Sequence, residues 1–157
     1  MARPSDPVPA KTERSQCEAL RQLAHDLIAA WNDHDARRVA SYFAEDYVGD
    51  DVAVAGQMRG PRDVRRYVTY NFLGFPDLRF ELHDTIAQGN RIALIWTVRG
   101  THKGKVMNIP PTGAQIEARG ISVLTVKDGK IVRSLRVWDV AGMLRHIGLL
   151  PDLPAMR

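Results

Sequence analysis

Two successive aspartates, Asp50 and Asp51, follow Tyr47 and Gly49 in the sequence. Neighbouring carboxylates can split their pKa values, so that one of them becomes a useful base. Adjacent residues of an extended segment point to opposite faces, and at most one of the two can therefore face an interior. The pair is either the source of one catalytic carboxylate or part of a loop of solvated charge.

Arg136 and Trp138 form a second candidate group, because period-two alternation places both side chains on one face of a strand. An arginine stays protonated and cannot serve as an ordinary base, but its guanidinium can bind a carboxylate or stabilise an enolate or oxyanion. If Arg136 points into a pocket, Trp138 lines that pocket too.

Histidines and cofactor motifs give little further chemistry. The five histidines lie on separate predicted elements, without a carboxylate or a second histidine at the spacing of metal ligands. The sequence also lacks a glycine-rich phosphate loop and the motifs G-x-G-x-x-G, H-E-x-x-H and G-x-S-x-G. We therefore expect no metal and no organic cofactor.

The elements that must position these residues follow from hydrophobic periodicity. Helical spacing predicts three helices, at about 15–32, 35–43 and 61–74. Alternation and turn signals predict an extended segment followed by two pairs of strands, at 46–54, 78–87, 92–102, 115–126 and 130–139. Asp128-Gly129 is a strong hairpin signal, and a short helix near 140–147 closes the pattern.

This order of elements predicts an α+β fold in which three N-terminal helices pack on a curved antiparallel sheet and a short C-terminal helix follows. The concave side of such a sheet forms a pocket. We divide the chain into a disordered leader with three prolines, one domain and a tail, at 1–14, 15–150 and 151–157.

Composition limits the classes of protein that fit. The 157 residues are 45% hydrophobic and 25% charged, which is typical of one soluble globular domain. The net charge of +4 is scattered rather than gathered on one element, so we expect no nucleic-acid partner. We find no segment long enough to span a membrane and no secretory signal, and Cys17 has no internal partner. We expect a cytoplasmic protein without a membrane partner.

Several motifs together resemble the SnoaL-like polyketide cyclase family. They span nearly the whole predicted domain: Ala30-Trp31-Asn32, Tyr42-Phe43-Ala44-Glu45-Asp46-Tyr47, Phe75-Pro76-Asp77-Leu78, Thr101-His102-Lys103-Gly104, Ile109-Pro110-Pro111-Thr112-Gly113, Asp128-Gly129-Lys130-Ile131 and Leu144-Arg145-His146-Ile147-Gly148-Leu149. The resemblance implies a cone-shaped α+β barrel of the nuclear transport factor 2-like kind, with a deep apolar pocket. It also implies a homodimer or a higher homo-oligomer.

The resemblance further implies cofactor-independent ring closure of an anthraquinone-type polyketide by intramolecular aldol chemistry. Such a reaction needs one positioned base, a donor for the developing enolate and exclusion of water. In the ring-closing members an aspartate on the last strand is the acid/base, assisted by a histidine on the preceding strand. The matching positions here hold Arg136 and Ser122, so a base must come from elsewhere.

We predict three catalytic residues. Arg136 is the donor to an anionic oxygen, and His102 or Asp139 is the proton-transfer partner. His102 matches the family's histidine before a glycine, although a histidine that holds the bend at 103–104 explains it too. Asp139 precedes a helix, where N-capping is the other interpretation. The predicted substrate contacts, several of which core packing explains as well, are Ser122, Trp138, Trp31, Tyr47, Asp51, Phe72, Trp96 and Met107.

Three functions fit these observations. The leading hypothesis is ring closure of a polycyclic aromatic polyketide in antibiotic biosynthesis. A cofactor-independent hydroxylase, or monooxygenase, of such a substrate is the second. A non-catalytic module that binds a small molecule is the third, because fold alone does not fix function.

Overall fold

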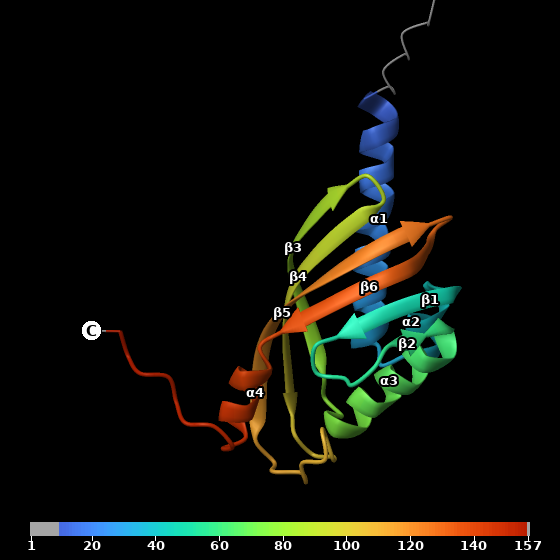
Figure 1. Ribbon diagram of the computed structural model, residues 1–157. Helices are drawn as coiled ribbons and strands as arrows, with labels where there is room; N and C mark the ends of the chain where they lie inside the picture. Colours follow the sequence, from blue (N-terminus) through green and yellow to red (C-terminus); the bar gives the residue numbers. More distant parts are fainter. Residues whose placement is uncertain (1–9, 157) are drawn as a thin grey trace, which may run out of the picture.

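The computed structural model describes residues 10–156 (Figure 1). The helices of this part are α1 (Ala10–Asn32), α2 (Ala36–Ser41), α3 (Gly60–Gly74) and α4 (Val140–His146). The strands are β1 (Phe43–Asp51), β2 (Met58–Arg59), β3 (Arg79–Gln88), β4 (Arg91–Thr101), β5 (Gln115–Lys127) and β6 (Lys130–Trp138). The α+β class and the element order agree with the prediction, apart from the short strand β2, which the sequence did not indicate.

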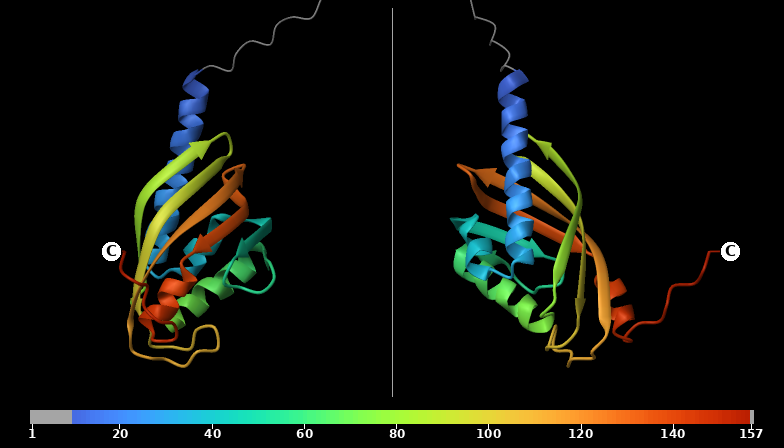
Figure 2. Two further views of the ribbon diagram at one scale, coloured as in Figure 1. Left: turned by 60° about the vertical axis from the view of Figure 1, so that its left-hand side comes forward. Right: turned by 180° about the vertical axis from the view of Figure 1, so that it is seen from behind.

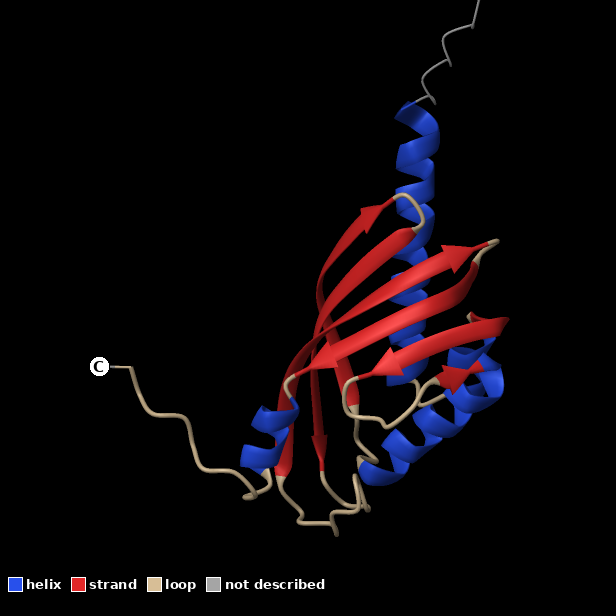
Figure 3. Ribbon diagram, in the orientation of Figure 1, coloured by secondary structure: helices blue, strands red, loops and turns tan. Residues whose placement is uncertain are grey.

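All the strands form one curved sheet in the order β2-β1-β6-β5-β4-β3 (Figure 3). Strands β3 to β6 pair antiparallel as expected, but β1 runs parallel to β6, which corrects the prediction of a wholly antiparallel sheet. A parallel pair needs a long connection. Here β1 and β6 are joined through α3 and four other sheet strands, so no hairpin constrains their direction.

The helices α1 and α3 cover the concave side of this sheet (Figure 2). Buried residues at helical spacing, Leu20, Ala24, Leu27 and Trp31, form the inner face of α1, and α1 packs against β3. Val64 and Val68 do the same for α3, which packs against β1. The site described below lies between these two helices and the sheet.

Helix boundaries follow local chemistry. Asp35 caps α2, because its carboxylate accepts a hydrogen bond from Arg38 N (2.9 Å), and Pro61 lies in the first turn of α3, as predicted.

Helix α1 begins at Ala10 rather than near Ser15, so residues 10–14 of the predicted leader are helical. They follow the last leader proline and include good helix formers. Residues 1–9 of that leader lie outside the described part.

Within residues 10–156, no helix combines the length and the apolar character needed to cross a membrane.

Candidate active site

The site is built on one row of residues that crosses the sheet. Asp51 of β1 is paired with Arg136 of β6, which is paired with Ser122 of β5, which is paired with Leu94 of β4. Residues directly opposite one another on neighbouring strands point to the same face. The row therefore brings an acid, a cation and a hydroxyl together on the concave side.

Two adjoining chambers lie over this row. The larger, of about 610 Å³ with the space at its mouth that is open to solvent, is lined mainly by apolar and aromatic side chains, with Tyr47, Tyr67, Ser122, Ser134 and Arg136 as its polar groups. The smaller, of about 380 Å³, shares Tyr67 and Arg136 with the first and is also lined by Asn71, Trp138 and Met143. Both chambers are narrow between their lining side chains, so a polycyclic occupant would have to shift those side chains.

Arg136 stands between the chambers inside an aromatic box. Its guanidinium carbon lies 5.2 to 5.9 Å from four ring centroids, those of Trp31, Tyr67, Trp96 and Phe80. These distances are typical of cation–π contacts. Arg136 Nη1 donates to Tyr67 Oη (3.0 Å), and within residues 10–156 the guanidinium makes no ion pair. A permanent cation with spare N–H donors in an apolar cavity is suited to an anionic oxygen.

Tyr67 connects this cation to a buried carboxylate. Its hydroxyl donates to Asp51 Oδ2 (2.5 Å) while it accepts from Arg136. Burial raises the pKa of the Tyr67 phenol well above its ordinary value, against the opposing effect of the Arg136 charge, so Tyr67 is protonated at neutral pH. Asp51 is 4% exposed, and its other oxygen accepts from Trp138 Nε1 (2.9 Å) and Ala53 N (2.8 Å).

The remaining polar groups of the larger chamber pair with one another. Tyr47 Oη lies 2.6 Å from Ser134 Oγ, and Trp96 Nε1 donates to Ser122 Oγ (3.1 Å). Burial also raises the pKa of Tyr47. On β5, a Cβ atom at Gly120 would collide with the rings or stems of both Trp96 and Trp138, so a glycine is needed for these tryptophans to lie against the strand.

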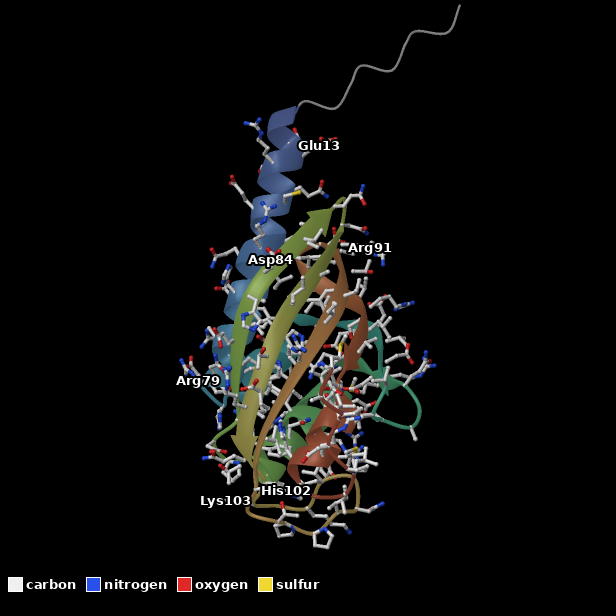
Figure 4. The ribbon with its side chains drawn as sticks, turned by 90° about the vertical axis from the view of Figure 1, so that its left-hand side faces the viewer. Glu13, Arg79, Asp84, Arg91, His102 and Lys103 are labelled. Atoms are coloured by element: carbon white, nitrogen blue, oxygen red, sulfur yellow. The ribbon has the colours of Figure 1, made fainter. Side chains whose placement is uncertain are left out.

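The structure gives His102 a different setting. It lies at the end of β4 where the long loop to β5 begins, at the opposite end of the strand from Arg91 (Figure 4). Its Nδ1 accepts from Thr112 N (3.3 Å) and lies 2.9 Å from Thr112 Oγ1, which ties the two ends of the loop together. Its side chain is fully buried and lines neither chamber. This geometry favours the loop-holding interpretation over the predicted catalytic one.

Asp139 likewise does not reach the chambers. It is exposed, and its carboxylate accepts from Gly142 N (2.8 Å) as the N-cap of α4. The capping interpretation therefore explains its place at the end of β6, and the predicted proton-transfer role has no support in the geometry.

The predicted substrate contacts divide into two groups. Those that line a chamber are Trp31, Tyr47, Trp96 and Ser122 in the larger one and Trp138 in the smaller one. Those that do not are Asp51, Phe72 and Met107. Asp51 lies one hydrogen bond behind Tyr67 and Trp138, Phe72 packs edge-on against Trp31, and Met107 lies on an outer groove beside Tyr70.

Sequence reasoning missed Tyr67 and Asn71 as site residues. Tyr67 was assigned only to the inner face of the third helix, between Val64 and Val68. A tyrosine on an otherwise apolar inner face needs a partner for its hydroxyl, and that signal points to a polar site facing the helix. Within residues 10–156, no group of three or more His, Cys, Asp or Glu side chains is placed to hold a metal ion.

A cone of curved sheet and helices around an apolar chamber that holds one arginine defines an α+β barrel protein with a buried small-molecule site. The family model of the SnoaL-like polyketide cyclases matches residues 21–147, and the chain belongs to this family. The predicted family and fold are thus confirmed.

Individual relatives include a cyclase and a hydroxylase candidate. Nogalonic acid methyl ester cyclase from Streptomyces nogalater is 26% identical over 124 residues, which cover 78% of this chain and 92% of the relative. Among solved structures, the hydroxylase candidate AclR from Streptomyces galilaeus is 28% identical, with a TM-score of 0.78 over 88% of this chain and 90% of its own. IdmH from Streptomyces antibioticus, a polyketide cyclase candidate, is 26% identical with a TM-score of 0.71, over 82% of this chain and 97% of its own.

Proposed function

We propose that this chain is an enzyme that closes a ring of an anthraquinone-type polyketide ester by an intramolecular aldol reaction, using only its own side chains. The observation that carries the proposal is the Arg136 guanidinium, which is enclosed by four aromatic rings and has no ion pair within residues 10–156. The similarity to a polyketide ester cyclase supports the same substrate class.

Arg136 acts on the carbonyl oxygen next to the carbon that loses its proton. As the enolate forms, negative charge grows on that oxygen, and a fixed cation in a chamber of low polarity stabilises it much more than water would. The flat aromatic rings around the guanidinium, Trp31 and Trp96 among them, offer stacking surfaces for a planar substrate.

Asp51 supplies the base through Tyr67. The substrate C–H bond breaks as its proton moves to the Tyr67 oxygen, while the phenolic proton of Tyr67 moves to Asp51. The resulting carbanion attacks a second carbonyl carbon and forms the new C–C bond. The alkoxide left on that carbonyl takes a proton from Tyr67, which regains one from Asp51, so that all protons balance and no oxidant is used.

The test is to incubate the purified protein, without added cofactor, with methyl esters of anthraquinone-type polyketide intermediates while product mass and dissolved oxygen are followed together. The expected product has an unchanged mass, and no oxygen is consumed. Arg136→Gln lowers the rate of its formation by at least about tenfold, whereas Arg79→Gln, at an exposed arginine on β3, leaves the rate unchanged. Binding without turnover would instead favour a non-catalytic module.

A hydroxylase is the second candidate, and the similarity to the hydroxylase candidate AclR over 88% of the chain is the observation that favours it. In that case an electron-rich substrate reacts with molecular oxygen in the same chamber. Oxygen consumption together with a product heavier by one oxygen atom would establish this function and overturn ring closure.

A further inference from the structure

The smaller chamber contains one polar group that the proposed ring closure does not use. Asn71 lies in the last turn of α3 and lines this chamber. Its Nδ2 atom donates to the backbone oxygen of Tyr67 (2.8 Å). Because only the nitrogen of the amide group can donate to a carbonyl oxygen, this bond also fixes where the amide oxygen, Oδ1, lies.

The amide oxygen of Asn71 is free to accept a hydrogen bond from a ligand. Within residues 10–156 it has no hydrogen-bond partner. In the same part of the chain, His102 Nε2 is the one side-chain nitrogen or oxygen that is both sealed from solvent and unpaired, so Asn71 Oδ1 borders open space. An acceptor at the wall of a largely apolar chamber needs a donor once water leaves the chamber.

The other polar groups of the smaller chamber leave it with donors and no further strong acceptor. Tyr67 Oη and Trp138 Nε1 both donate to Asp51, so neither donor is free. Arg136 keeps spare N–H donors beside its bond to Tyr67 (3.0 Å). Asn71 is four residues beyond Tyr67, on the same face of α3. The chamber therefore offers a cationic donor and, about one helical turn away, an amide acceptor.

The rest of the smaller chamber suits an aromatic ring. Its other lining residues are apolar: Phe75, Leu78, Phe80, Trp96, Val98, Ile116 and Met143. The two chambers share Phe80 and Trp96 as well as Tyr67 and Arg136, so a flat molecule that lies against these rings can extend from one chamber into the other.

We propose that the smaller chamber holds an outer ring of the substrate and that a phenolic hydroxyl on this ring donates to Asn71 Oδ1. The proposal rests on the proposed function, which makes the substrate a planar aromatic polyketide with a carbonyl oxygen at Arg136. Asn71 then selects a ring with a free hydroxyl. A methyl group or a methyl ether at the same place brings no donor and leaves Oδ1 unpaired, which weakens binding.

The test compares two ligands of similar size, 2-hydroxyanthraquinone and 2-methylanthraquinone, in a mildly acidic buffer that keeps the phenol protonated. All three tryptophans of the chain line a chamber, so quenching of their fluorescence reports binding there. The wild type is expected to bind the hydroxyl compound at least about threefold more tightly than the methyl compound. Equal binding, or no binding of either compound, would overturn the proposal.

The variant Asn71→Leu assigns this preference to one residue. Leucine is similar in size to asparagine and has no acceptor, so Asn71→Leu binds the methyl compound at least as tightly as the hydroxyl compound. The matched control is Asn90→Leu, at an exposed asparagine in the turn between β3 and β4, which keeps the preference of the wild type. A hydroxyl preference that survives in Asn71→Leu would place the acceptor elsewhere and refute the assignment.

These titrations separate this proposal from the proposed function, because they need no turnover. A hydroxyl preference that depends on Asn71 in a protein that closes no ring would support the binding role and reject the ring closure. Ring closure by a protein without that preference would do the reverse.

Discussion

Arg136, which is half-buried, and His102, which is fully buried, are both basic side chains near the ends of sheet strands, yet the fold uses them in opposite ways. The His102 ring is bonded to Thr112 across the base of a loop, and it contributes to how that loop is held. The Arg136 guanidinium has one hydrogen bond to a tyrosine within residues 10–156 and otherwise faces aromatic rings and a chamber. His102 Nε2 also has no hydrogen-bond partner within residues 10–156, but the residue lines neither chamber, so contact with a chamber is what separates the candidate for chemistry from the structural residue.

The largest effect expected from this comparison is at Arg136. Arg136→Met keeps the length of the side chain but removes the cation, so turnover falls by about 10²- to 10³-fold. The unfolding free energy stays the same or rises, because a half-buried cation that makes no ion pair within residues 10–156 is replaced by an apolar group. Steady-state kinetics measure turnover, and urea unfolding measures the unfolding free energy. If Arg136→Met unfolded easily yet retained turnover, Arg136 would be a structural residue rather than a catalytic one.

Tyr67→Phe comes next. It interrupts the path between the substrate and Asp51 and lowers turnover by about 10²-fold, within the usual range for loss of acid–base catalysis. The Asp51 carboxylate also loses a charge-assisted hydrogen bond, which lowers the unfolding free energy by about 1.5–3 kcal/mol. Tyr70→Phe is the control, because in the described part of the chain the Tyr70 hydroxyl has one hydrogen bond, which it accepts from Met107 N on the outer surface. Equal rates for the two variants would exclude the relay.

For His102 the expected effects are on stability alone. His102→Ala removes the bonds to Thr112 and lowers the unfolding free energy by about 1–3 kcal/mol, while turnover per folded molecule stays within about twofold of the wild type. Urea unfolding and rates corrected for the folded fraction test this. If His102→Ala were as stable as the wild type but had little turnover, His102 would have a catalytic role.

The smallest effect is a dependence on alkaline pH. Since burial raises the folded-state pKa of Tyr67 above its ordinary value near 10, the stabilisation that its neutral form contributes is present below pH 10 and declines as the pH rises further. Unfolding free energies above pH 10 should thus fall more steeply in the wild type than in Tyr67→Phe. Tyrosinate absorbance near pH 10 in the folded protein should be the same in both, and a smaller signal in the variant would contradict the burial of Tyr67.

Local patterns in the sequence were enough to predict most of the fold. Asp35, Pro61 and Asp128-Gly129 act on their immediate neighbours, and the structure places a cap, a first helical turn and a hairpin there. The site depends on contacts between distant parts of the chain. The Tyr67 hydroxyl bonds to Asp51, which lies 16 positions earlier in the chain, and to Arg136, which lies 69 positions later. Asp51 in turn bonds to Trp138, 87 positions away.

Such distant contacts could not be read from local spacing. The parallel pairing of β1 with β6 decides that Asp51 rather than Asp50 faces inward, and no turn signal marks that pairing. Arg136 and Ser122 were placed through the family resemblance, and they are direct partners across β5 and β6. Asp139 shows the opposite case, since its local role as a helix cap was visible in the sequence and accounts for it fully.

The backbone at Gly120 has a consequence for how this cavity can change over time. Because the Trp96 ring rests where a side chain at position 120 would be, a carbon added there must be matched by a smaller side chain at position 96, whereas the contact with Trp138 is made by its Cβ, which a smaller ring would keep. Positions 120 and 96 are therefore expected to vary together among homologues. In directed evolution for larger or smaller substrates, paired changes at 120 and 96 should be accepted more often than the single change at 120.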